Sequence, residues 1–277
     1  MLAEFSRVCE KHNIKWWADA GTLLGAVRHK GFITWDDDID ICVMREDYKR
    51  LCEFAKKEFS LPYFWQTMDT EPNSWVAFAK LRNSNTTMLG ASELALLKNN
   101  AGKLDYNSGI FIDIFPMDNW PEDDIYLHSH VMNIRRLYRK YCFITSITSS
   151  YVPARKLWKR PVKALLHHLA TLFRFSPSIA DNILTTIWEE KKALSSLDLP
   201  NGKYVAETVF ADAEGFLERL IRERSWFDET EYLPFEMISV PVPSGWEHIL
   251  SRQFGNWHEY VITRGHGAFY DADRPLT

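Results

Sequence analysis

The chain has 277 residues, of which 46% are hydrophobic, so it can bury the core of one large domain or of two small ones. Its 33 basic and 37 acidic residues give a formal net charge of −4, which argues against a general nucleic-acid-binding protein. The 4 cysteines include no Cys-x-x-Cys pair, which favours reduced thiols over disulfides or a zinc site. With no recognisable signal peptide and no apolar run of transmembrane length, we expect a cytoplasmic protein.

The first predicted elements are a helix, a short strand and a second helix. Apolar residues recur at helical spacing over 2–12, and residues 14–18 have the composition of a strand. This strand leads into the turn Gly21-Thr22, and residues 22–27 are predicted to form a short helix. The backbone N–H groups at the start of that helix can bind phosphate oxygens, and Thr22 can either cap the helix or contact the phosphate.

Four aspartates within five residues follow, ending in Asp38-Ile39-Asp40. The apolar residues 41–43 after them predict a buried strand, which would place the Asp38 and Asp40 side chains on one face, about 7 Å apart. Two carboxylates so placed repel each other, and a hard divalent cation such as Mg²⁺ (or Mn²⁺) removes the repulsion. The alternative interpretation is a solvated acidic loop.

Two groups of basic residues are candidates for contacts with an anionic substrate. Arg28 and His29 belong to a basic rim just ahead of the acidic loop. Lys80 and Arg82 lie at the end of a strand predicted over 75–81, and strand alternation puts both cations on one face, where they can contact an anionic group. Solvated surface charge is the alternative in both cases.

Asp113 is an acid within an apolar predicted strand, where it shares a face with Phe111 and Phe115. Burying an isolated carboxylate is costly or raises its pKa, unless a basic partner or a metal compensates. A buried ion pair and a metal ligand therefore both remain open. Asp118 follows Pro116, is expected in a loop, and is a weaker candidate.

The second half of the chain carries a basic, acid-free span. Residues 125–180 contain no Asp or Glu but ten Lys or Arg and four His. Amphipathic patterns predict helices over 155–173 and 179–197. The basic face either packs on the N-terminal part of the protein or contacts an anionic membrane surface or an anionic glycan.

The remaining predicted elements are a helix over 47–59, short strands near 204–210, 225–235 and 236–242, and a helix over 246–254. Gly255 is the expected C-terminal stop of the last helix. His266 is a candidate substrate contact, although a packed or exposed histidine without such a role is the more common case.

The stretch from Gly21 to Ile41 resembles the signature of the LicD family, and the stretch 109–118 resembles its second motif. The LicD family lies within the nucleotidyltransferase-fold superfamily, whose members carry a Gly-Gly or Gly-Ser turn at a helix start, an Asp-x-Asp on the next strand and a third acid on a later strand. Here Thr22 stands where Ser is common, and Thr34 stands where the family usually has Pro. Neither departure removes a ligand.

The resemblance implies an α/β (α+β) fold, in which a nucleotidyltransferase-like mixed sheet is flanked by helices and carries a helical insertion or subdomain. The expected domains are a catalytic core over 1–120, a basic helical insertion over 121–200, and a C-terminal segment over 201–277 that completes the catalytic domain. The implied catalytic and metal-binding residues are Asp38, Asp40 and Asp113. The implied substrate-binding residues are Gly21, Thr22, Arg28, His29, Lys80, Arg82 and His266.

LicD-like proteins transfer phosphocholine from CDP-choline to a glycan hydroxyl, and relatives transfer other phospho-alditols from CDP-linked donors. The resemblance therefore implies a LicD-like phosphotransferase that depends on Mg²⁺ or Mn²⁺ and releases CMP. The implied acceptor is a glycan or lipid-linked glycan of a cell-surface polysaccharide, lipopolysaccharide or teichoic acid. Nucleotidyl transfer from an NTP, a metal-dependent phosphodiesterase and a non-catalytic, Trp-rich glycan-binding module are the alternatives.

The basic span predicts reversible binding at the inner face of the membrane. Each near-surface cation adds about 1 kcal/mol of attraction to anionic lipid, and salt screens this attraction over about 10 Å at 0.1 M. We expect salt-sensitive co-sedimentation with anionic vesicles. It should be lost when five residues become Gln: Arg155, Lys156, Lys159, Arg160 and Lys163. Turnover on a soluble acceptor should survive the change, and a wild-type protein that ignores anionic vesicles at low salt would contradict this prediction.

Overall fold

The computed structural model describes residues 1–72, 78–90, 104–121, 129–137, 182–183, 185–187, 189–191, 193, 202–211, 219–260 and 269–275. The chain divides into two compact units. The first comprises Met1–Glu122, Leu199–Glu207 and Leu217–Thr277, and the second comprises Asp123–Asp198 and Thr208–Phe216. The predicted domain boundaries at 120 and 200 stay a prediction. His266, the five basic residues between 155 and 163, and the start of the predicted strand 75–81 lie outside the described residues.

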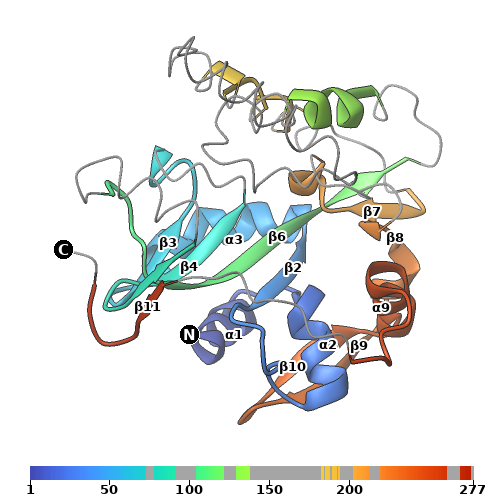
Figure 1. The fold of residues 1–277 in the computed structure, drawn as a ribbon, viewed down its shortest axis with the longest axis horizontal. Helices are drawn as coiled ribbons and strands as arrows, with labels where there is room; N and C mark the ends of the chain where they lie inside the picture. Colours follow the sequence, from blue (N-terminus) through green and yellow to red (C-terminus); the bar gives the residue numbers. More distant parts are fainter. Residues whose placement is uncertain are drawn as a thin grey trace, which may run out of the picture. The chain divides into compact units, whose positions relative to one another are not determined.

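A mixed sheet forms the centre of the first unit, which confirms the predicted fold class (Figure 1). Five strands lie in the order β1-β2-β6-β4-β3, and β7 and β8 extend the sheet from the far end of β6. The strand bounds are Trp17–Ala18 (β1), Asp40–Met44 (β2), Tyr63–Gln66 (β3), Ala79–Asn83 (β4), Ile110–Trp120 (β6), Tyr204–Ala206 (β7) and Ile221–Glu223 (β8). The β2–β6 pair is parallel, whereas the other pairs are antiparallel.

Two smaller sheets accompany the central one. They are formed by β9 (Thr230–Phe235) with β10 (Ile238–Pro243), and by β5 (Thr87–Leu89) with β11 (Phe269–Asp271). The β9–β10 hairpin packs against α2 and β1, so this C-terminal part of the chain belongs to the same body as the N-terminal elements.

The helices of the first unit agree with the periodicity of the sequence. Their bounds are Leu2–Lys11 (α1), Ala20–His29 (α2), Arg45–Glu58 (α3) and Trp246–Phe254 (α9), with short 3-10 turns at Thr208–Phe210 (in the second unit) and Arg224–Phe227. Gly255 ends α9 with a φ of 69°, as predicted. No helix among the described residues is long and apolar enough to cross a membrane.

Several predicted elements differ from the structure. Of the strand predicted near 204–210, only Tyr204–Ala206 is a strand, and Thr208–Phe210 is a 3-10 turn. The strand predicted over 225–235 starts instead with the 3-10 turn Arg224–Phe227 and becomes a strand at Thr230. The strand expected over 14–18 is reduced to Trp17–Ala18.

Asp118 was expected in a loop after Pro116, but β6 continues through Pro116 to Trp120. The described pairing of β4 with β6 ends at Ile114, two residues before Pro116. The missing N–H of Pro116 therefore removes no hydrogen bond from that antiparallel ladder.

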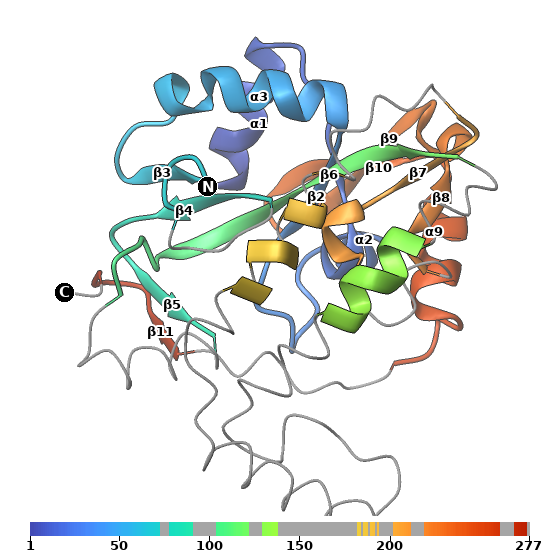
Figure 2. The same cartoon turned by 90° about the horizontal axis from the view of Figure 1, so that it is seen from above.

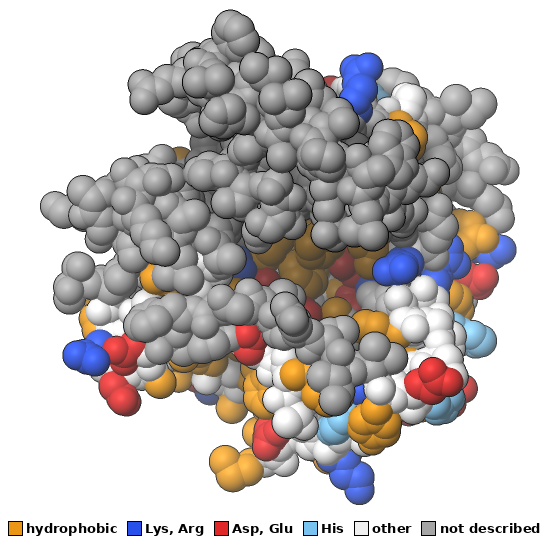
Figure 3. All heavy atoms as spheres, in the orientation of Figure 1, with side chains coloured by type: hydrophobic (Ala, Val, Ile, Leu, Met, Phe, Trp, Pro, Cys, Tyr) orange, Lys and Arg blue, Asp and Glu red, His pale blue; other side chains and the backbone are white. Residues whose placement is uncertain are grey.

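Strand alternation divides the central sheet into an apolar face and a polar face. Ile41 and Val43 on β2, with Ile112 and Ile114 on β6, are fully buried in the core together with apolar residues of α1 and α3. Figure 2 shows α1 and α3 on the same side of these strands. Asp40 and Asp113 alternate with these residues, so they face the other side of the sheet. Acidic and basic side chains are interspersed on the described surface seen in Figure 3, in keeping with the small net charge.

The packing of α3 on the sheet yields a stability prediction. Leu51 on α3 is fully buried in the core, so Leu51→Ala should lower the free energy of unfolding by about 2–5 kcal/mol, through lost apolar contacts and a residual cavity. Met237 at the β9–β10 turn is 99% exposed, so Met237→Ala should change it by less than about 0.5 kcal/mol. Chemical denaturation measures both, and equal effects would contradict the assignment of Leu51 to the core.

Candidate active site

Three charged residues lie side by side on neighbouring strands of the central sheet. Asp40 on β2 is the register partner of Asp113 on β6, and Asp113 is in turn the partner of Lys80 on β4. Neighbouring strands are about 4.8 Å apart, so the three side chains start close together on one face. Lys80 Nζ lies 2.5 Å from Asp113 Oδ1. Asp113 therefore lies between another carboxylate and an ammonium group.

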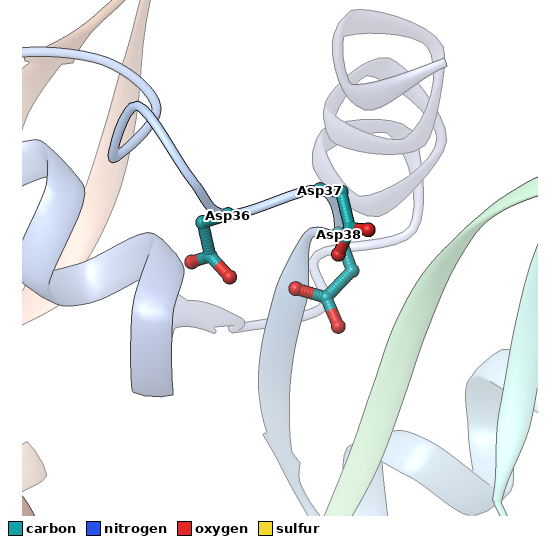
Figure 4. A group of neighbouring side chains, drawn as sticks. All are labelled: Asp36, Asp37 and Asp38. Carbon is teal, nitrogen blue, oxygen red and sulfur yellow. The ribbon is translucent and has the colours of Figure 1, made fainter. Parts of the chain in front are cut away.

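The loop between α2 and β2 adds three more carboxylates. Asp36, Asp37 and Asp38 can each offer an oxygen within 4.8 Å of the others (Figure 4). Asp38 was predicted to share a strand face with Asp40, but β2 begins at Asp40 and Asp38 lies in the loop before it. A Cβ on Gly21 would lie only 2.0 Å from Asp36 Oδ2, so glycine at this position leaves room for the Asp36 carboxylate against the start of α2.

The crowding of acids disfavours ionisation. Burial raises the pKa of Asp40 well above its usual range, and the charges of Asp38, Asp113, Asp19 and Asp36 raise it further. Burial also raises the pKa of Asp113, although the Lys80 ammonium opposes this shift. Such a set of crowded carboxylate oxygens fits Mg²⁺ or Mn²⁺, because hard cations prefer oxygen ligands and relieve the repulsion.

The N-terminus of α2 holds the backbone of Asp40. Thr22 Oγ1 accepts a hydrogen bond from Asp40 N at 2.9 Å, and Asp19 N donates to the carbonyl oxygen of Asp40 at 3.0 Å. Asp19, and not Thr22, caps the helix, since its Oδ1 accepts from Ala20 N at 2.7 Å. The Thr22 hydroxyl can still donate its hydrogen to another group. Gly21 and Thr22 are thus placed beside Asp40.

A buried ion triad behind this turn was not predicted from the sequence. Arg222 Nη1 on β8 lies 2.7 Å from Asp19 Oδ2, and Arg222 Nη2 lies 2.6 Å from Glu207 Oε1. Burial opposes the charge of Asp19, but the charge of Arg222 and the hydrogen bonds from Glu207, Arg222 and the Ala20 N–H together outweigh it and lower the pKa of Asp19. Burial raises the pKa of Glu207 well above its usual range. Arg222 is 203 residues from Asp19 in the sequence, and no local pattern connects the two.

The remaining basic candidates have other contacts. Arg82 is 2% exposed and donates to Gln66 Oε1 at 2.6 Å and to the Gly109 carbonyl oxygen at 2.8 Å, so it stabilises the interior. Arg28 and His29 lie in the last turn of α2, about 10 Å along the helix from Gly21 and Thr22.

Arg28 is bound to the chain after α9. It donates to the carbonyl oxygens of Trp257 and Glu259, and its guanidinium lies 4.4 Å from the centre of the Tyr260 ring.

The described structure therefore puts Lys80 in direct contact with Asp113. Arg82 lies two residues along the same face of β4, where its charge lowers the pKa of Asp113 although the hydrogen bonds given above go to interior groups. Arg28 and His29 lie at the opposite end of α2 from Gly21 and Thr22.

The sheet and its row of acids, with a helix N-terminus beside them, define the class: a nucleotidyltransferase-like enzyme domain. Residues 13–146 match the family described as LicD/FKTN/FKRP, nucleotidyltransferase domain. This match confirms the predicted resemblance to the LicD family, and together with the Haemophilus influenzae relative described next it confirms the prediction of a LicD-like phosphotransferase.

Relatives agree with this assignment. The chain is 26% identical over 258 residues to the lipopolysaccharide cholinephosphotransferase LicD of Haemophilus influenzae, covering 93% of this chain and 87% of that protein. Uncharacterised proteins of Rickettsia prowazekii and Rickettsia typhi are each 51% identical over shorter segments, covering 23% and 17% of this chain and 24% and 15% of those proteins. No solved structure matches the chain.

The raised pKa of Asp40 predicts a pH dependence of stability. In the folded state Asp40 binds a proton at pH values where the unfolded chain, with an ordinary Asp pKa of about 3.9, has lost it. Since the folded state then binds more protons, stability falls as pH rises from about 4 to the raised pKa. Asp40→Asn should remove the part of this decrease that Asp40 causes, while the raised pKa values of Asp113 and Glu207 leave a smaller decrease of the same sign. The melting temperature of the wild type should therefore fall more steeply with pH than that of the variant over this range.

Adding Mg²⁺ should reduce the same decrease in the wild type, because a bound cation offsets the carboxylate charge. Thermal melts at a series of pH values measure both effects. A wild type and an Asp40→Asn variant with parallel pH profiles would contradict the prediction.

Proposed function

We propose that the protein transfers phosphocholine, or a similar phospho-substituent, from a CDP-linked donor such as CDP-choline to a glycan hydroxyl, with release of CMP. The observation that carries the proposal is the row formed by Asp40, Asp113 and Lys80, in which a cation for phosphate lies next to carboxylates for a metal. The activity named for the Haemophilus influenzae relative supports phosphocholine as the group and lipopolysaccharide as the acceptor. Teichoic acid or another cell-surface polysaccharide is a further candidate acceptor.

In the proposed reaction the acceptor oxygen attacks the phosphorus that bears the choline. The bond from that phosphorus to the bridging oxygen breaks, and CMP leaves with its electron pair. Lys80 contacts the transferred phosphate, and Gly21 and Thr22 offer a backbone N–H and a hydroxyl to the diphosphate. Most of the rate enhancement in such a transfer comes from positioning and charge neutralisation.

Asp113 is proposed to have one of two roles. A carboxylate has two oxygens, so Asp113 can keep Lys80 on Oδ1 and still accept the proton of the acceptor hydroxyl. Burial raises its pKa, which makes it a stronger base. Alternatively, it joins Asp38 and Asp40 as a metal ligand. Mg²⁺ or Mn²⁺ bound by these carboxylates would neutralise charge on the diphosphate.

Two alternative activities use the same carboxylates. Nucleotidyl transfer from an NTP would release pyrophosphate in place of CMP, and a phosphodiesterase would need no glycan acceptor. A non-catalytic glycan-binding module would bind the acceptor tightly without metal and would turn nothing over.

The proposed location is the cytoplasm, with peripheral contact at the inner face of the membrane, where a lipid-linked acceptor is accessible.

The proposal predicts CMP release that requires both a CDP-linked donor and Mg²⁺ or Mn²⁺. A panel of CDP-choline, CDP-ribitol and CDP-glycerol, with a glycan acceptor, should show CMP release from one of them, and EDTA should abolish it. Asp113→Asn should lower the rate by about 10²–10⁴-fold, since it removes the proposed base or ligand, and Asp40→Asn should abolish turnover. Pyrophosphate release from CTP or ATP would instead favour nucleotidyl transfer.

Asp118 provides the matched control on the same strand. It pairs with Arg45 through contacts of 2.5 and 2.9 Å and lies five residues beyond Asp113. Asp118→Asn should lose stability and keep most of the turnover. An Asp118→Asn variant as inactive as Asp113→Asn would show that the rate depends on the integrity of β6 and not on the acid row.

A further inference from the structure

The N-terminal turn of α2 fixes Asp40 from both sides. The carbonyl oxygen of Asp40 accepts from Asp19 N at 3.0 Å, and its N–H donates to Thr22 Oγ1 at 2.9 Å. Asp19 also starts the helix, because its side chain accepts from Ala20 N and its carbonyl oxygen accepts from Leu23 N at 2.9 Å. Any displacement of this turn therefore displaces the backbone of Asp40, and with it the position of its carboxylate opposite Asp113.

This turn needs support from outside itself. Ala20 has a φ of 44°, in the left-handed region that residues with a Cβ rarely adopt. Gly21 follows it with the Asp36 carboxylate packed against its Cα. A backbone in this region persists only where the surrounding structure over-determines it.

Arg222 supplies that support through Asp19. The side chains of Arg222 and Asp19 are each 1% exposed, and Arg222 Nη1 lies 2.7 Å from Asp19 Oδ2. Glu207, 4% exposed, places its Oε1 2.6 Å from Arg222 Nη2, a close charge contact without hydrogen-bond geometry. A buried carboxylate deprived of its partner is strongly destabilised, so the Asp19 carboxylate remains where the guanidinium is.

We propose that Arg222 is a positioning residue for the active site: by holding Asp19 it fixes the N-terminal turn of α2 and thereby sets Asp40 opposite Asp113. Arg222 and Glu207 lie beyond the family segment 13–146, so the C-terminal part of the chain completes the site. The inference rests on the proposed function only in taking Asp40 as a metal ligand. A purely structural triad, which stabilises the interior and leaves Asp40 unaffected, is the competing explanation.

Arg222→Lys is the main test, because the single ammonium of lysine lacks the two separated nitrogens with which the planar guanidinium contacts Asp19 through Nη1 and Glu207 through Nη2. Mn²⁺ affinity is measured by electron paramagnetic resonance on folded protein. Loss of a partner that orients a metal ligand typically costs about 10–100-fold in metal affinity, and we expect a weakening in that range. Asp19→Asn, which keeps a cap acceptor but loses the charge, should weaken Mn²⁺ binding in the same direction.

Arg45→Lys is the matched control. It alters an Arg–Asp pair of the same kind at the far end of β6, where Arg45 contacts Asp118 and not the α2 turn. Arg45→Lys should lose stability and retain wild-type Mn²⁺ affinity. Glu207→Gln is the mildest variant, because Arg222 keeps Asp19 as a partner, and it should fold and weaken Mn²⁺ binding by less than Arg222→Lys.

Hydrogen exchange of the Asp40 amide provides a readout that needs no metal. It should accelerate in Arg222→Lys and remain as in the wild type in Arg45→Lys, because only the first change loosens the turn that holds this N–H. Wild-type Mn²⁺ affinity and wild-type Asp40 exchange in every Arg222, Asp19 and Glu207 variant that folds would overturn the proposal. The wild type could bind Mn²⁺ no better than Asp40→Asn while Arg222→Lys still accelerates exchange of the Asp40 amide. That result would refute the metal assignment and leave the positioning role standing.

Discussion

The constraint on which the structure depends is the enforced proximity of several carboxylates. Asp40 and Asp113 are neighbours across a parallel strand pair, and the loop with Asp36, Asp37 and Asp38 lies beside them. Left to themselves these groups would separate, because like charges in a partly buried site repel. The backbone ladder of the sheet prevents separation, and Lys80 offsets part of the charge. A hard cation bound by these oxygens would relieve the repulsion, which is the basis of the metal site proposed above.

The two faces of the central sheet have different roles, one in stability and the other in the candidate active site. The face with Ile41, Val43, Ile112 and Ile114 packs into a core with α1 and α3, which makes the strands rigid. The opposite face carries Asp40 and Asp113, which are the sequence neighbours of these apolar residues. Functional groups on packed strands are held more precisely than groups on loops, so the stability of one face provides the geometry of the other.

Most of the basic residues that contact the site or its surroundings serve the fold. Arg82 stabilises the interior, Arg45 pairs with Asp118, and Arg28 holds the chain after α9. Arg222 is fully buried between two acids. Lys80 differs, because it reaches the acid row on which the proposed chemistry rests. Guanidinium groups suit fixed bidentate contacts, whereas an ammonium group on a flexible stem can change partners when a phosphate arrives.

The sequence by itself determined the local elements and the identity of the acids. Helical periodicity located α1, α3 and α9, and the apolar residues after Asp40 located β2, because these patterns repeat within one element. The density of uncommon residues from Gly21 to Ile41 indicated the family. The sequence did not show that β6 passes through Pro116, since proline normally ends a strand and the pairing that tolerates it involves distant residues.

Only the tertiary structure decided the register that sets Asp113 between Asp40 and Lys80, the separation of Arg28 and His29 from the acids, and the partnership of Arg222 with Asp19. Each of these depends on which strands pair and on which residue lies opposite which. A side-chain pattern reports spacing along one element, whereas strand register and the burial of an ion pair between residues 203 apart are set by the packing of the whole unit.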